Sequence, residues 1–157
     1  MKKLVAFVVL VVLIISGVII YKKTRPPESD RIRAEMQRVL YGTDDPAIKV
    51  MRFDQLSIEL GSAYIDEKKY DMAVALYERK IEDIRKEGED QKRTDGRRHS
   101  TSYAHEAAQF QMLNVIYKLA GDNESAAKAQ KKADALEEKA ERAKQREPKE
   151  PKKSILD

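Results

Sequence analysis

The fold is decided by the stretch LGSAYIDEKKYDMAVALY, residues 60–77, in the middle of the chain. Gly61 has no side chain, so two helices can approach each other closely at this point. Ala73 is a small contact residue further along, and Tyr64 and Tyr77 supply broad apolar surface that fills the space between helices. A polar run separates the two halves. This spacing predicts two helices that pair as an antiparallel hairpin.

The same residues resemble the tetratricopeptide repeat (TPR), a helix–turn–helix unit that stacks on its neighbours and offers its open face to partner proteins. The resemblance covers roughly residues 54–87 and, more weakly, residues 107–140. The corresponding leucines, Leu60 and Leu113, are 53 residues apart, which exceeds the repeat period of about 34. An unrelated bundle of helical hairpins is the alternative. The residues that depart from the repeat pattern are Ser57, Lys80, Arg85, Asn114 and Gln130.

Helical periodicity runs through the rest of the chain, and strand and hairpin signals are missing, so the sequence predicts an all-α fold. It consists of an N-terminal transmembrane helix, TPR-like antiparallel helical hairpins and a long C-terminal helix. The helices of the soluble part are expected at about residues 29–41, 46–65, 70–87, 102–120 and 123–147.

Capping residues set these boundaries. Ser29 is expected to cap the first soluble helix and Gly42 to end it, while Asp45 and Pro46 start the next one. Gly88 is expected to close the second helix of the hairpin. The predicted core face of the first soluble helix consists of Ile32, Met36, Val39 and Leu40.

Two further segments have a distinctive composition. Residues 88–101 (GEDQKRTDGRRHST) contain no large apolar residue and are expected to form a solvated loop, more readily a tolerated insertion than an interaction loop. The C-terminal helix carries alanines at helical spacing with one leucine, Leu136, among charged residues. It is expected to be the polar cap of a repeat array. A coiled-coil seam for homo-oligomer formation is the less favoured alternative.

The N-terminus contains seventeen uncharged, mostly large apolar residues (4–20), which Tyr21 extends. This length predicts a single-pass membrane anchor over residues 4–21. A cleaved signal peptide is the alternative, but a basic flank follows the run in place of a small-residue cleavage site. Basic residues lie on both sides of the run, so the membrane side of the soluble domain stays open. The predicted domains are therefore the anchor and flank (1–25), the TPR-like helical domain (26–147) and a disordered tail (148–157).

Charge is distributed unevenly along the chain. The net charge is +4 overall, and residues 1–25 contain five basic residues and no acid, so residues 26–157 carry a net charge of −1. A nucleic-acid-binding domain needs a clustered basic surface, and the near-neutral soluble part argues against one. The basic flank suits attraction to anionic lipid headgroups.

Sequence motifs for catalysis are missing. The chain has no cysteine, and its two histidines, His99 and His105, do not have the H-E-x-x-H spacing of a zinc site. The six glycines are scattered and form no phosphate-binding loop. The sequence therefore predicts a protein that is not an enzyme and uses no metal or cofactor.

Two functions fit this reading. The favoured one is a membrane-tethered adaptor that binds a protein or peptide partner; the alternative is a structural or assembly subunit of a membrane or cell-envelope complex. In TPR-like hairpins the exposed side of each first helix faces the binding groove. Carried over, this predicts a protein-binding surface formed by Gln55, Ile58, Ser62, Ile65, Asp66, Gln111, Val115 and Lys118, with Ala108 and Leu119 beside it.

Overall fold

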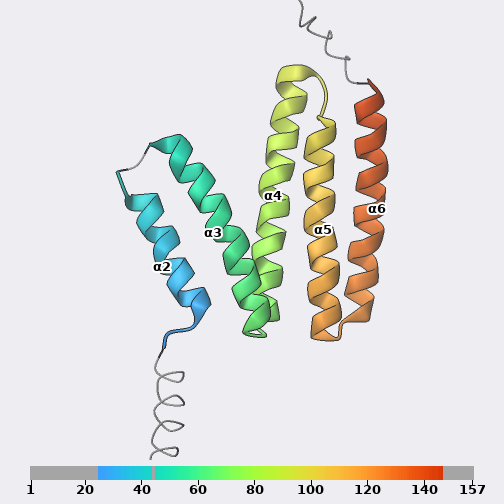
Figure 1. Ribbon diagram of the computed structural model, residues 1–157. Coiled ribbons are helices and arrows are strands. Elements are labelled where there is room, and N and C mark those ends of the chain that lie inside the picture. Colours follow the sequence, from blue (N-terminus) through green and yellow to red (C-terminus); the bar gives the residue numbers. More distant parts are fainter. Residues whose placement is uncertain (1–24, 44, 147–157) are drawn as a thin grey trace, which may run out of the picture. The chain divides into compact units, whose positions relative to one another are not determined.

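The computed structural model describes residues 25–43 and 45–146, and all regular secondary structure in these ranges is α-helical (Figure 1). The predicted all-α class is confirmed for this part of the chain. The predicted anchor and tail lie outside the described residues. Among residues 25–43 and 45–146, no helix has both the length and the apolar character that crossing a bilayer requires. The helices are α2 (Glu28–Tyr41), α3 (Pro46–Asp66), α4 (Tyr70–Asp95), α5 (Ser100–Ala120) and α6 (Asn123–Arg146).

The described residues form two units, 25–63 and 64–146, with the boundary inside the last turns of α3. The first unit contains α2 and most of α3. The second contains the end of α3 followed by α4, α5 and α6. The hairpin predicted at residues 54–87 crosses this boundary, so its pairing stays a prediction, and each unit is described by itself.

Helix α2 begins one residue earlier than predicted and is not capped by Ser29. Pro27 occupies the N-cap position in an extended conformation, and its carbonyl accepts hydrogen bonds from the amides of Asp30 (3.0 Å) and Arg31 (3.2 Å). Ser29 instead lies in the first turn and is fully buried. Proline is tolerated at this end of a helix, because the amide hydrogen that it lacks would have no partner inside the helix.

The predicted core face of α2 is correct in three of its four positions. Ile32, Met36 and Val39 are buried, but Leu40 is 53% exposed. Successive helical residues are about 100° apart, so Leu40 lies well round the helix from Val39. The stripe is therefore narrower than predicted, and Gly42 follows its end as expected.

The start of α3 is confirmed. Pro46 is its first residue, and the carboxylate of Asp45 accepts a hydrogen bond from the amide of Ala47 at 2.8 Å. This bond satisfies one of the amides that the first helical turn leaves without a partner. The apolar stripe of α3 is largely buried, with Phe53 half-buried and Leu56, Leu60, Ala63 and Tyr64 buried.

Two turns of the second unit end their helices in the same way. The amide of Lys69 bonds to the carbonyl of Tyr64 (2.8 Å), and the amide of Lys68 bonds to that of Ile65 (3.0 Å). Gly121 and Asp122 repeat this pattern after α5. These are Schellman motifs, which need one residue in the left-handed conformation. Gly121 takes that position after α5 (φ 83°), but after α3 it is a lysine, Lys68 (φ 56°).

Helix α4 is longer than predicted, and the expectation that Gly88 closes it is wrong. The helix continues to Asp95 and stops at Gly96, which adopts the left-handed conformation (φ 70°). The segment 88–101 is therefore mostly helix, with a short loop at 96–99. Good helix formers such as Glu89, Lys92 and Arg93 occur in its helical part, which also has ion pairs at i,i+3, such as Lys92 with Glu89 at 2.6 Å. Such a helix needs little apolar burial of its own.

The core of the second unit is built around α5, which packs against α4 on one side and α6 on the other (Figure 1). Helix α6 contributes mainly alanines, which allow it to approach α5 closely. Two of the departures from the repeat pattern meet at this contact, because the side-chain amide of Asn114 donates to Gln130 at 2.6 Å. The core side chains are Ala73, Tyr77, Ile81, Ala107, Phe110, Leu113, Ile116, Ala126, Ala129, Ala133 and Leu136.

Candidate functional site

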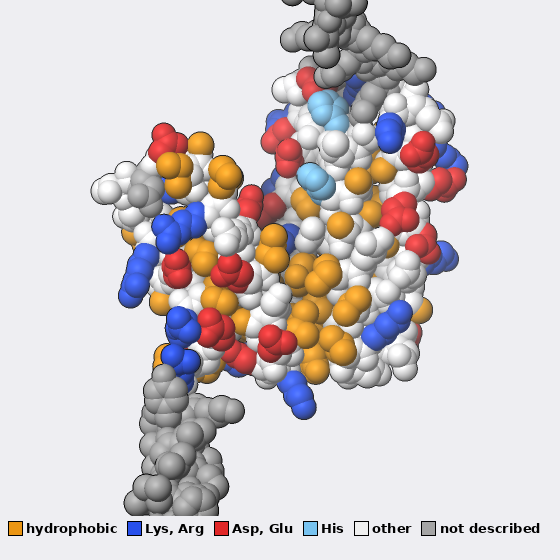
Figure 2. All heavy atoms as spheres, viewed as in Figure 1, with side chains coloured by type: hydrophobic (Ala, Val, Ile, Leu, Met, Phe, Trp, Pro, Cys, Tyr) orange, Lys and Arg blue, Asp and Glu red, His pale blue; other side chains and the backbone are white. Residues whose placement is uncertain are grey.

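The predicted binding residues of α5 lie on its exposed face. Val115 is 46% exposed and Leu119 52% exposed, and Ala108 and Lys118 are also exposed. Gln111 is exposed too, and its amide donates to Glu137 of α6. On the face of the second unit that Figure 2 shows, hydrophobic side chains gather over α4 and α5. The surface predicted on α5 is thus available to a partner.

The predicted residues of α3 are divided between the two units. Gln55, Ile58 and Ser62 belong to the first unit and are exposed, with Ile58 at 60%. Ile65 and Asp66 belong to the second unit, where Asp66 is exposed and Ile65 is half-buried. The structure thus keeps the residues predicted on α5 together in the second unit and divides those predicted on α3 between the two units. A groove shared by both sets stays a prediction.

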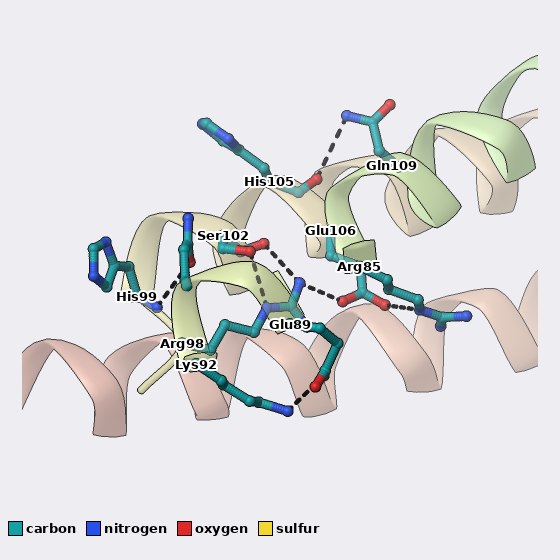
Figure 3. Close-up of polar contacts among 10 residues, drawn as sticks. Arg85, Glu89, Lys92, Arg98, His99, Ser102, His105, Glu106 and Gln109 are labelled. Carbon is teal, nitrogen blue, oxygen red and sulfur yellow. Dashed lines mark hydrogen bonds and ion pairs between the residues drawn. The ribbon is translucent and has the colours of Figure 1, made fainter. Parts of the chain in front are cut away.

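A charged cluster that the sequence reading missed lies between α4 and α5 (Figure 3). The carboxylate of Glu106, whose side chain is only 3% exposed, binds two arginines. Arg85 of α4 contacts it through Nε at 2.6 Å, and Arg98 of the α4–α5 loop contacts the second carboxylate oxygen through Nη2 at 2.8 Å. Two cations around one buried carboxylate leave an excess of positive charge at this point.

Arg98 is held in place by several further contacts. Its side chain is 9% exposed, its Nε donates to the hydroxyl of Ser102 at 2.9 Å, and its guanidinium lies 4.4 Å from the ring centre of Tyr103. It also lies against Gly88, where a Cβ would come within 2.8 Å of the Arg98 Cδ atom. Gly88 therefore lies within α4 and does not end this helix. Because Gly88 has no side chain, the buried side chain of Arg98 fits against the helix at this point.

Two sequence signals pointed to this cluster. Glu106 lies on the apolar stripe of α5, between Tyr103 and Phe110, and an acid on a core face requires a buried partner. Arg85 stands where the repeat pattern has a helix-closing proline. An arginine in place of that proline indicates that the helix continues beyond residue 85. The loop that carries Arg98 then lies next to the start of α5.

A groove lined by α4, the α4–α5 loop, α5 and α6 opens from this cluster. Its larger part has a volume of about 530 Å³, and its smaller part, of about 300 Å³, shares Arg98, Tyr103 and Lys139 with it. Among the described residues, only Glu89 and Glu106 contribute carboxylates to the lining. The basic lining residues from α4 and the loop are Arg85, Lys92, Arg97 and Arg98. Those from α6 are Lys132, Lys139, Arg142 and Arg146. We call this the basic groove.

Among the described residues, the groups with shifted pKa values are Tyr77, Tyr117 and Asp122. Burial raises the pKa of the Tyr77 phenol. The pKa of Tyr117 is raised by burial and then by the carboxylates of Glu78 and Asp122. Both phenols are therefore protonated at neutral pH. Asp122 has a lowered pKa because the backbone amide of Ser125 donates to its carboxylate.

Neither histidine belongs to a group that resembles a metal site. His99 lies in the loop before α5 and contacts Asp95 at 2.8 Å, while His105 is exposed on α5. In the part of the chain that the structure describes, no three His, Asp or Glu side chains are arranged to hold a metal ion.

Comparison of the chain with protein-family models, with curated proteins and with solved structures finds no match. The resemblance to the TPR therefore rests on the residues of the chain alone.

Proposed function

We propose that this chain is a membrane-tethered adaptor that binds a partner protein through a TPR-like helical surface. The observation that carries the proposal is the exposed face of α5, where Val115 and Leu119 lie one helical turn apart with about half of their surface in water. Exposed apolar side chains that are neighbours on one surface are typical of interaction sites. The predicted anchor at residues 4–21 supplies the tether, and the face of α5 supplies the contact.

The adaptor proposal is tested by affinity purification of the full-length chain from membranes. We expect the double substitution Ile58→Asp and Val115→Asp to remove a substoichiometric partner, because a charge in an apolar contact has to be desolvated. Far-UV circular dichroism should show unchanged helicity, since both side chains are exposed. An unchanged set of co-purifying proteins would contradict the proposal.

A structural or assembly subunit is the second candidate, and the first unit favours it. Tyr41 and Met51, near the connection between α2 and α3, are 87% and 74% exposed, and Leu40, Ile48 and Val50 are exposed beside them in the sequence. A permanent neighbour in a complex would cover such residues. This candidate predicts a partner that co-purifies at a fixed ratio and is lost with Tyr41→Asp and Met51→Asp, while Ile58→Asp with Val115→Asp has no effect.

A further inference from the structure

We propose that the basic groove binds an extended acidic segment of a partner protein. This site is separate from the α5 surface of the adaptor proposal. It is lined by Tyr103, Glu106 and Phe110, whereas Val115 and Leu119 point from another side of α5. The proposal therefore goes beyond the adaptor surface, and either of the two can fail without the other.

The charge of the groove is the first argument. The charged residues that α6 places in the groove are all basic, although one of them, Arg142, pairs with Glu138. The acids of α6, none of which lines the groove, are Glu124, Asp134, Glu137, Glu138 and Glu141. Among the described residues, no carboxylate lies within ion-pair distance of Lys132 or Lys139. These two amines are therefore not neutralised by a carboxylate, although that of Lys132 lies over the ring of Phe110 at 5.2 Å. A concave surface with an excess of one sign of charge concentrates ligands of the opposite sign.

The rigidity of the arginines is the second argument. Glu106 binds Arg85 through Nε at 2.6 Å, and the Arg85 side chain, which lines the groove, is 53% exposed. Arg98 is fixed by Ser102, Glu106 and the ring of Tyr103. A guanidinium held in one orientation binds a carboxylate at a lower entropic cost than a mobile one.

The shape of the groove is the third argument. Along α6 it runs from Lys132 to Arg146, which at the rise of an α-helix is about 21 Å. An extended chain of roughly six or seven residues has this length. Phe110, Ala135 and Leu136 line it between the basic residues, and Ala135, the exposed one of the three, provides an apolar contact for a side chain of the ligand. A single small anion would leave most of this surface unused.

The test uses the full-length chain in nanodiscs of zwitterionic lipid and a fluorescein-labelled peptide of about seven residues, made of glutamates around one central phenylalanine. We expect saturable binding by fluorescence anisotropy that weakens as salt is raised. The substitutions Lys132→Glu and Lys139→Glu together should weaken the affinity about tenfold or more, because they reverse two charges in the groove.

The matched control is Lys131→Glu with Lys144→Glu, which makes the same change of charge on the exposed surface of α6 outside the groove. It should change the affinity by less than about twofold. Equal weakening by both pairs, or equal binding of a peptide with glutamines in place of glutamates, would overturn the proposal. So would displacement of the peptide by equimolar inorganic phosphate or short-chain phosphatidylserine, which would indicate a site for small anions or for lipid headgroups.

Discussion

Among the residues that the structure describes, Lys68 is the one non-glycine residue with a positive φ. It takes the left-handed conformation (φ 56°) that ends α3, where the corresponding turn after α5 has Gly121. Side chains disfavour this conformation by about 1 kcal/mol, which is partly offset by the greater freedom of glycine in the unfolded chain. We therefore expect Lys68→Gly to raise the free energy of unfolding by about 0.5 kcal/mol.

Denaturant unfolding followed by circular dichroism measures this change. The reciprocal substitution Gly121→Lys is the control and should lower the free energy of unfolding by about 1 kcal/mol. A loss of stability in Lys68→Gly would show that the lysine side chain contributes more than its backbone costs.

Gly88 allows a test of the buried arginine. In a helix interior, glycine to alanine normally stabilises by about 1 kcal/mol. Here the added Cβ would come within 2.8 Å of Cδ and 2.9 Å of Cζ of Arg98, a side chain held in place by Ser102 and Glu106. We expect Gly88→Ala to destabilise the protein in chemical denaturation.

The same substitution in an Arg98→Ala background is the matched control. With the arginine removed, the usual gain of about 1 kcal/mol should return. If Gly88→Ala stabilises the unaltered chain by that amount, Arg98 does not pack against residue 88.

Asp122 makes the start of α6 sensitive to pH. Hydrogen bonding, first from the backbone of Ser125, lowers its pKa below the usual value of 3.8. Because the folded-state pKa is depressed, the charged carboxylate contributes stability above pH 3.8, and this contribution is lost as the pH falls through the folded-state pKa. We expect Asp122→Ala to lower the Tm at neutral pH.

The difference in Tm between Asp122→Ala and the unaltered chain should then disappear at acidic pH. Thermal unfolding at a series of pH values measures this difference. Asp122→Asn is the control, because its oxygen also accepts from Ser125 but carries no charge. A difference that stays constant down to low pH would contradict a capping role for the ionised carboxylate.

At the scale of elements, the sequence predicted helices where apolar residues recur or caps are present. The start of α3 followed from Asp45 and Pro46, and three buried residues of α2 from their spacing. The end of α4 was missed because Gly88 was interpreted as a stop, although its function is to accommodate a side chain that lies ten residues later. Contacts of this kind are tertiary, and local propensity carries no information about them.

The same limit applies to the candidate sites. The exposed face of α5 was predictable from helical periodicity. The basic groove was not, because its lining residues come from three helices whose order in space only the fold provides. Asn114 and Gln130 are a further example. Each departs from the repeat pattern, and the sequence alone did not indicate that their side chains form a hydrogen bond.

The close approach of α6 to α5 depends on alanine. Ala133 is fully buried, and a larger side chain would have to displace α5. We expect Ala133→Leu to lower the free energy of unfolding by about 1–3 kcal/mol. Ala140→Leu is the matched control on the half-buried second half of the helix and should change it by about 0.5 kcal/mol or less. Similar losses at both positions in denaturant unfolding would contradict the difference in packing along α6.

At the scale of the whole molecule, the proposed adaptor consists of a predicted membrane anchor and a small helical body. A repeat array of this type usually needs about three repeats, and here the resemblance covers two at most. A short binding surface is expected to have modest affinity on its own. Tethering to a membrane raises the effective concentration of a partner held in the same membrane, so a weak contact is sufficient.

Photo-crosslinking from α5 tests the adaptor function most directly. A photoreactive phenylalanine analogue replaces Val115 in the full-length chain within its native membrane, and Lys144 of α6 is replaced in the same way as the control. For an adaptor, we expect a discrete crosslinked protein from position 115 that is lost when Leu119→Asp is added. We expect no such product from position 144. The same pattern of products from both positions, or no discrete product from position 115, would contradict the adaptor function.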